Sequence, residues 1–298
     1  MPDNDHLNKE ALYVDENRNI HRGEEAIKRI NARKIDYVDI TKGVTCVDIE
    51  RWNEAQRYER RTWMDGIAAM SDRNELHESC YGNYLSIHKK KFSKAIELGC
   101  GPFTNIRKIL SYCFVEDITL LDPLANDYLK HPFCRYKNSK LGGILKTSII
   151  PWSKRGGFKH PFRFIKHKIN EWKIGKFRGR PITIVCSGIE SFKPTTKYDL
   201  CIMINVIEHC MNIDQIFERI LEMTKPGSYF IFADKVYDAK EEAELAIVKF
   251  DAGHPIRVDY SVIDSFLKHN FNAIWNNYVM LEGDDGSYTC SYFIGIRK

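Results

Sequence analysis

The chain has 298 residues, of which 43% are hydrophobic, and its 45 lysines and arginines against 40 acidic residues give a formal net charge of +5. This is an ordinary composition for a soluble globular protein with a sizeable core. It contains no run of 18 apolar residues and no basic, apolar start, so neither a spanning helix nor a secretory signal is expected. Nine scattered cysteines without a CxxC pair argue against a zinc site and suit a reducing cytoplasm, and a cytoplasmic location is expected.

The order of elements predicts an α/β fold. After a polar start, residues 49–70 form a helical pattern, and from Lys91 onward short apolar runs alternate with helical patterns. Helices are expected over 105–113, 213–224 and 261–270. Strands are expected over 94–100, 117–123, 181–189, 198–207, 228–236, 272–281 and 288–297. Alternation of this kind predicts a mostly parallel sheet covered on both faces, and the last two strands, with no helix between them, predict a hairpin with an antiparallel member.

A glycine loop follows the first of these strands. Glu97-Leu98-Gly99-Cys100-Gly101-Pro102 lies between a strand and a helix, which is the setting that a nucleotide-binding loop requires. Glycine allows a tight turn and a close approach of the backbone to a ligand, and the helix start offers unpaired N–H groups. Asp122 follows at the end of the second strand, 21 residues after Gly101, where a carboxylate can accept both ribose hydroxyls of an adenosine.

Four motifs together resemble the class I family of methyltransferases that use S-adenosylmethionine (SAM). They are ELGCGP, LLDP, YDLCIMINVIEH and KPGSYFIF, and the resemblance runs from Tyr84 to the C-terminus except for one basic stretch. It implies a Rossmann-like, seven-stranded, mostly parallel sheet with an antiparallel last strand and helices on both faces. SAM is the implied cofactor and S-adenosylhomocysteine its product. A dinucleotide dehydrogenase is the alternative, but GCGPFT lacks the third glycine of GxGxxG.

The same resemblance implies roles for individual residues. Glu97 supports the loop, whereas Gly99, Cys100 and Gly101 pass under the methionine part of SAM. Asp122, with Pro123 beside it, holds the ribose. Two further segments complete the implied cofactor site: Ile189 with Glu190 borders the adenine, and Asn205 lies by the methionine end.

Two departures from the family pattern affect this site. Phe103 stands where many relatives have a third glycine, so a tighter exit from the loop is expected. Gly188-Ile189 stands where an acid often reads the adenine amino group, and Glu190 is the candidate substitute.

The candidate catalytic residues are His254, His209 and Glu208. His254, in the loop after the fifth of these strands, can take a proton from a hydroxyl or amine during transfer, and some relatives carry a similar His-Pro-x-Arg segment. The alternative is a histidine that caps a turn and packs on Pro255. Glu208 and His209 follow the fourth strand, and a structural hydrogen-bond pair is the favoured interpretation there. No metal ligand is predicted, and because SAM carries its own leaving group no catalytic triad is needed.

Two segments outside the common core are candidates for acceptor contacts. The helix with Trp52, Gln56, Tyr58 and Trp63 is similar to N-terminal segments of methyltransferases that act on bacterial surface polysaccharides and secondary metabolites, and it is expected to act as a lid or as plain packing. Residues 137–180 hold thirteen lysines or arginines, interleaved with aromatics, against one acid. Such a stretch suits nucleic acid, an anionic membrane surface or a phosphate-bearing glycan, and the alternative is a solvated lid.

The sequence thus predicts an N-terminal extension and helical cap over 1–85 and a methyltransferase domain over 86–298 with an insertion at about 130–180. The preferred acceptor is an oxygen, before a nitrogen, of an anionic sugar, glycan or related small metabolite. An RNA methyltransferase is the first alternative, although Asn205-Val206-Ile207-Glu208 stands where base-methylating enzymes carry Asn-Pro-Pro-Tyr. A non-catalytic SAM-binding module is the second, peripheral membrane contact is a further option, and no oligomeric state is predicted.

Overall fold

The computed structural model describes residues 12–14, 20–22, 41–64, 74–131, 134–136, 181–239, 252–283 and 286–298. The basic stretch over 137–180 lies outside the described residues, and so do residues 65–70 of the expected N-terminal helix. Among the described residues, no helix is both long and apolar enough to cross a membrane.

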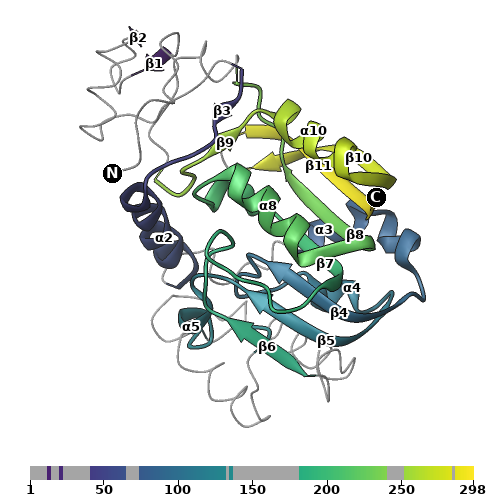
Figure 1. The fold of residues 1–298 in the computed structure, drawn as a ribbon. Helices are drawn as coiled ribbons and strands as arrows, with labels where there is room; N and C mark the ends of the chain where they lie inside the picture. The colour runs from purple at the N-terminus through teal and green to yellow at the C-terminus, as the bar shows by residue number, and fades with distance from the viewer. Residues whose placement is uncertain are drawn as a thin grey trace.

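A seven-stranded sheet forms the centre of the fold (Figure 1). Its strands run in the order β10-β11-β8-β7-β4-β5-β6, and β4 to β8 are parallel. β11 is antiparallel to both neighbours, as the expected hairpin requires. The strand bounds are β4 (Lys91–Leu98), β5 (Phe114–Leu121), β6 (Ile182–Val185), β7 (Tyr198–Ile204), β8 (Thr224–Lys235), β10 (Phe271–Gly283) and β11 (Gly286–Arg297). This is the predicted Rossmann-like methyltransferase fold.

The central strands are buried on both faces, because their side chains alternate between two cores. In β7, Cys201 and Met203 point to one core and Leu200 and Ile202 to the other. The first core is covered by α8 (Ile213–Met223) and α10 (Tyr260–Asn270), and the second by α3 (Asn74–Cys80), η3 (Gly82–Ile87) and α4 (Ile106–Ile109). Continuous apolar runs, rather than alternating ones, therefore mark these strands in the sequence.

The helices match expectation except after the glycine loop. The helix α4 was expected over 105–113 but covers only Ile106–Ile109, and turns of the chain continue to Cys113. By contrast, α8 and α10 begin at side-chain caps: Asn212 accepts a hydrogen bond from the Gln215 N–H, and Asp259 accepts one from the Ser261 N–H. Asn105, the residue before α4, makes no capping hydrogen bond with its side chain.

The N-terminal helix α2 (Ile49–Met64) stands beyond the carboxyl ends of the parallel strands, next to α5 (Ala125–Tyr128) (Figure 1). Two backbone pairings anchor the segment before it. β3 (Gly43–Val44) pairs with β9 (Arg257–Val258), and Thr45 and Val47 exchange backbone hydrogen bonds with residues 211–213. The chain before α2 is thus tied to both loops that carry the candidate histidines. A separate small hairpin joins β1 (Leu12–Val14) to β2 (Ile20–Arg22).

Candidate active site

The glycine loop is shaped by two residues in the left-handed region. Gly99 has φ 63° and Gly101 has φ 52°, conformations that glycine adopts without steric cost. A Cβ on Gly99 would lie 2.6 Å from the side chain of Val206, whereas a Cβ on Gly101 would meet no atom within 4 Å. Gly99 is therefore required by packing inside the protein, and Gly101 leaves open space at the surface of the loop.

Glu97 organises the chain that leaves this loop. Its side chain is buried and accepts hydrogen bonds from the Asn105 N–H at 2.6 Å, the Ile106 N–H at 3.0 Å and the hydroxyl of Thr104. The carboxylate thus satisfies donors at the start of α4 that no helical carbonyl can reach. Burial raises the pKa of Glu97, and these hydrogen bonds oppose that shift. The contacts agree with its expected loop-supporting place.

Asp122 lies at the end of β5, directly beside the loop. One carboxylate oxygen accepts the Gly101 N–H at 2.9 Å, and the other accepts the Leu124 N–H at 2.8 Å. Burial raises the pKa of Asp122 to about 6, although both hydrogen bonds favour the ionised form. The carboxylate thus connects the glycine loop to the turn after β5, and near neutral pH it is largely ionised.

The segment after β6 (Ile182–Val185) brings the expected adenine-side residues to the same edge. Ile189 is buried in the first core, and the carboxylate of Glu190 accepts the N–H groups of Met211 and Asn212 at 2.7 and 3.2 Å. A Cβ on Gly188 would lie 3.5 Å from the indole of Trp52 on α2. Glu190 therefore joins two loops through its side chain, and Trp52 stands over the glycine that precedes Ile189.

The residues after β7 take a sharp turn that a buried acid holds in place. Asn205 is exposed with φ 58°, and its N–H donates to the Ala233 carbonyl at 2.8 Å. Asp234, at the end of β8, accepts the N–H groups of Val206 and Ile207 at 3.1 and 2.8 Å. The turn orients the short helix η4 (Ile207–His209), which carries the next two candidate residues.

Glu208, His209 and His254 meet in one cluster. Glu208 is buried, with its side chain 2% exposed, and its Oε1 lies 3.4 Å from Nε2 of His254 and 3.7 Å from Nε2 of His209. Its other oxygen, Oε2, accepts from the Lys235 ammonium at 3.0 Å and from the Tyr237 hydroxyl at 2.7 Å. The two imidazoles lie 4.8 Å apart between ring centres. The structure thus brings together all three residues that the sequence nominates for the acceptor side.

The charged groups of this cluster shift one another's pKa values. Burial by itself would raise the pKa of Glu208, but its interactions with His254, His209 and Lys235 outweigh burial and lower it. Glu208 in turn raises the pKa of Lys235 against the effect of burial. The two groups form a buried ion pair, so Glu208 is an anion that faces both imidazoles throughout the neutral range.

Comparison with known proteins matches residues 55–273 to a family model described as "Methyltransferase domain". The matched region covers most of the chain and includes every candidate cofactor-binding and catalytic residue above. The chain belongs to this methyltransferase family. Together with its strand order, this makes it a class I enzyme that uses SAM. No curated protein matches the sequence.

Solved structures are similar to this methyltransferase at low sequence identity. The N-methyltransferase NodS from Bradyrhizobium japonicum, solved with S-adenosylhomocysteine, is 17% identical with a TM-score of 0.48, over 82% of this chain and 98% of that one. A SAM-dependent methyltransferase from Leishmania major is 14% identical with a TM-score of 0.50, over 99% of this chain and 98% of that one, and this likeness concerns the fold.

Helix α2 of the methyltransferase covers the cluster. The side chains of Trp52 and Gln56 both donate to the His209 carbonyl, at 3.1 and 3.0 Å. Arg51 donates to the Ala252 carbonyl at 3.1 Å, and one oxygen of Glu59 lies 3.7 Å from Nδ1 of His209. At the far end of the helix, Trp63 packs edge-on against Phe103 of the glycine loop. The helix therefore touches both the histidine cluster and the chain that leaves the glycine loop.

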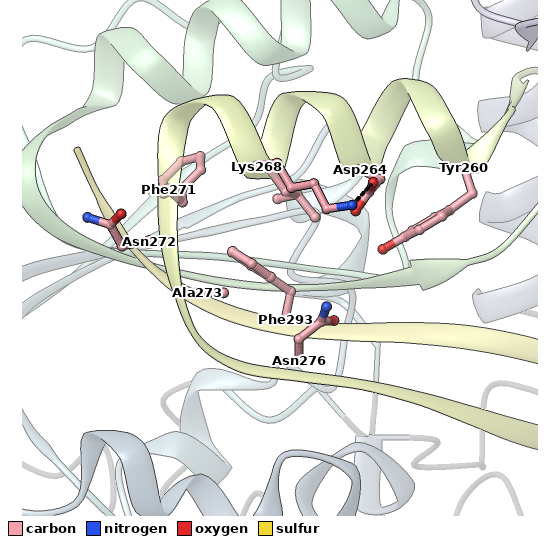
Figure 2. Close-up of a pocket in the computed structure, with 9 residues that line it drawn as sticks. Tyr260, Asp264, Lys268, Phe271, Asn272, Ala273, Asn276 and Phe293 are labelled. Atoms are coloured by element: carbon pink, nitrogen blue, oxygen red, sulfur yellow. Dashed lines mark ion pairs between the residues drawn. The ribbon is translucent and has the colours of Figure 1, made fainter.

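A separate cavity of about 250 Å³ lies between α10 and the β10–β11 hairpin (Figure 2). Lys268 and Asp264 form an ion pair on α10 beside it, and Phe271 and Phe293 are among the residues that line it. None of its lining residues belongs to the glycine loop, to Asp122 or to the histidine cluster. The cavity is therefore distinct from the candidate active site.

Several residues of the site carry no signal in the sequence pattern. Glu59 is one of many charged residues on α2. Asp234 and Lys235 end an ordinary strand, and Tyr237 follows it. Their position at the carboxyl end of β8, beside the segment that carries Glu208, is the one clue that could have nominated Asp234 and Lys235. Glu59 depends on how α2 docks, and no local pattern predicts that.

Proposed function

We propose that this methyltransferase transfers the methyl group of SAM to a hydroxyl oxygen of a sugar, glycan or related small metabolite. The observation that carries the proposal is the buried Glu208, which faces the imidazoles of His209 and His254 at the carboxyl end of β7. A hydroxyl must lose its proton during transfer, and a neutral amine already has a free lone pair. A charged cluster that accepts protons therefore favours an oxygen acceptor over a nitrogen.

On the cofactor side, the proposal places SAM across the carboxyl edge of the sheet. The ribose hydroxyls donate to Asp122 beside Pro123, and the methionine part crosses Gly99, Cys100 and Gly101 toward Asn205. The adenine lies near Ile189 and Glu190. Support comes from the open space above Gly101 and from the carboxylate of Asp122, which already accepts the Gly101 N–H at 2.9 Å. A glycine loop beside a carboxylate at the end of a parallel strand is an arrangement that binds the ribose of nucleotide-like ligands.

On the acceptor side, His254 stands nearest the acceptor hydroxyl, and the cluster with His209 and Glu208 handles the proton that the hydroxyl loses. The side chains of His254 and His209 are 26% and 21% exposed, so a ligand can reach them, whereas Glu208 is closed to solvent. A phosphate-bearing acceptor is preferred on composition, because the basic residues over 137–180 would pair with it.

The test combines SAM titration calorimetry with a panel of hydroxyl acceptors that begins with phosphorylated sugars and glycans. The variant His254→Ala is expected to lower kcat about 100-fold or more, the usual contribution of a positioned acid–base group, while the Kd for SAM stays within about two-fold. The exposed His88, next to η3, provides the matched control His88→Ala with unchanged turnover. Unaltered turnover in His254→Ala, or transfer to amines alone, would contradict the proposal.

A further inference from the structure

We propose that Glu59, His209, His254 and Glu208 bind a divalent transition-metal cation that activates the acceptor hydroxyl. The inference rests on the proposed transfer to a hydroxyl and changes how the proton is lost, because the histidines then act as metal ligands and not as proton acceptors. The sequence alone predicts no metal site, because the four donors come from three segments: α2, η4 and the loop before β9. The structure is what brings them together.

The donor atoms have the spacing that a cation needs. Glu59, His209 and His254 each offer one ligand atom, and these three atoms all lie within 4.8 Å of one another. Oε1 of Glu208 lies 3.4 Å and 3.7 Å from Nε2 of His254 and of His209. Ligands bound at about 2.0–2.2 Å to one metal ion stand roughly 3 to 3.5 Å from one another, so small side-chain rotations close the shell.

The hydrogen bonds around the cluster leave suitable lone pairs pointing inward. Nδ1 of His209 lies 3.1 Å from the Gly253 carbonyl and 3.7 Å from Oε1 of Glu59, so a proton on Nδ1 leaves the Nε2 lone pair, on the side of Glu208, for a cation. The oxygen of Glu208 that faces the imidazoles is not the one held by Lys235 and Tyr237. Glu59 is held by the Trp63 indole N–H at 2.9 Å through its other oxygen. Each carboxylate thus has one oxygen anchored and one directed at the histidines.

The charge and exposure of the cluster also suit a cation. Two carboxylates, those of Glu59 and Glu208, face the imidazoles, and Lys235 forms an ion pair with Glu208. Side chains of Glu59, His209 and His254 are between 13% and 26% exposed, which leaves coordination positions that a water or an acceptor oxygen can fill. Two imidazoles with carboxylate oxygens favour first-row divalent transition metals over Mg²⁺ or Ca²⁺.

A cation at this point would perform the proton step of the transfer. It acidifies the acceptor hydroxyl that it binds, whose O–H proton passes to solvent. The oxygen then forms its bond to the methyl carbon as the S–CH₃ bond of SAM breaks, and neutral S-adenosylhomocysteine leaves. The cation would also link α2 to the loop of His254 through Glu59 and His254.

The test is titration of the metal-stripped, full-length protein with Co²⁺, read by its d–d absorption without SAM or acceptor. We expect one equivalent of Co²⁺ in the wild type, at least about ten-fold weaker binding in Glu59→Gln, and loss of the site in His209→Ala and in His254→Ala. His269→Ala, at an exposed position on α10, is the matched control and should bind like the wild type. Circular dichroism and SAM titration verify that each variant is folded.

Equal Co²⁺ binding by the wild type and by both histidine variants would overturn the site, and so would the absence of stoichiometric binding. Methyl transfer to hydroxyls that is unchanged by chelator would also overturn it, while the proposed function would stand. Stoichiometric Co²⁺ at the histidines without transfer to any hydroxyl acceptor would support the site and contradict the proposed function. The two ideas therefore fail separately.

Discussion

The two halves of the candidate site are held together by different forces. In the cofactor half, the carboxylates of Glu97 and Asp122 accept hydrogen bonds mainly from neutral donors, most of them backbone N–H groups, within the stretch 97–124. In the acceptor half, Glu208 interacts with Lys235 and with imidazoles that lie on different elements. The first half depends on local backbone geometry, and the second depends on charged side chains that long-range packing brings together.

This difference indicates which changes affect which step. A change in the cofactor half alters the shape of the loop, and hence stability or SAM affinity. A change in the acceptor half is expected to alter turnover more than SAM affinity, although the two halves touch where Val206, next to η4, packs on Gly99 and where α2 spans both. We therefore ask, beginning with the change expected to matter most, whether the cofactor half and the acceptor half can be altered independently.

The largest effect is expected for Glu97→Ala. The change leaves the N–H groups of Asn105 and Ile106 and the hydroxyl of Thr104 buried without their acceptor, at about 1–3 kcal/mol for each group. We expect the free energy of unfolding to fall by about 3 kcal/mol or more, measured by urea denaturation. Glu116→Ala, on the exposed side of β5, is the control and should change stability by less than about 0.5 kcal/mol. Similar stabilities for the two variants would show that the loop does not depend on Glu97.

The pair Gly99→Ala and Gly101→Ala separates folding from binding within the loop. Both positions have positive φ, but only the new Cβ at 99 would overlap Val206, at 2.6 Å. We expect Gly99→Ala to lower the free energy of unfolding by about 2 kcal/mol or more, beyond the roughly 1 kcal/mol of backbone strain that both variants share. Gly101→Ala should instead weaken SAM binding, because its Cβ occupies the space proposed for the ligand. A Gly101→Ala variant with normal SAM affinity would contradict the placement of methionine.

The affinity for SAM should depend on pH through Asp122. Burial raises the pKa of Asp122 to about 6, and the ribose hydroxyls are proposed to donate to its ionised form. Lowering the pH through 6 protonates Asp122 in the free enzyme and opposes SAM binding. The Kd for SAM at pH 5 should therefore be about ten-fold higher than at pH 7. Calorimetry at both pH values measures this ratio. Asp122→Asn should bind SAM more weakly at pH 7 and lose the dependence, and a wild-type Kd that stays constant would argue against ribose binding here.

A smaller effect is expected where α2 covers the acceptor half. Trp52→Phe removes the indole N–H that donates to the His209 carbonyl at 3.1 Å, but Gln56 donates to the same oxygen. We expect a loss of about 0.5–1 kcal/mol in unfolding free energy and a modest rise in KM for the acceptor. Tyr58→Phe, at a half-exposed position on the same helix, should behave like the wild type. A large loss of SAM affinity in Trp52→Phe would show that the helix couples the two halves.

The cofactor half and the sheet were largely predictable from the sequence. Apolar runs such as those that form β4 and β7 can be recognised locally because both of their faces are buried, and the glycines mark the turn that follows. The contacts of Glu97 and Asp122 lie within residues 97–124, so the motifs in that stretch were enough to identify both residues as candidates. Two features depart from the local sequence pattern. The helix α4 ends after four residues, and Cys186, which stands in an apolar run, is exposed.

The fold class, the glycine loop and the identity of the histidines worth testing could thus be predicted from local sequence patterns. What those histidines face depends on long-range packing. Glu59 and His254 are separated by nearly 200 residues, and they meet because β3 pairs with β9 and α2 docks across the carboxyl edge of the sheet. This docking depends on side chains of several elements at once, and the hydrophobic periodicity of one segment does not predict it.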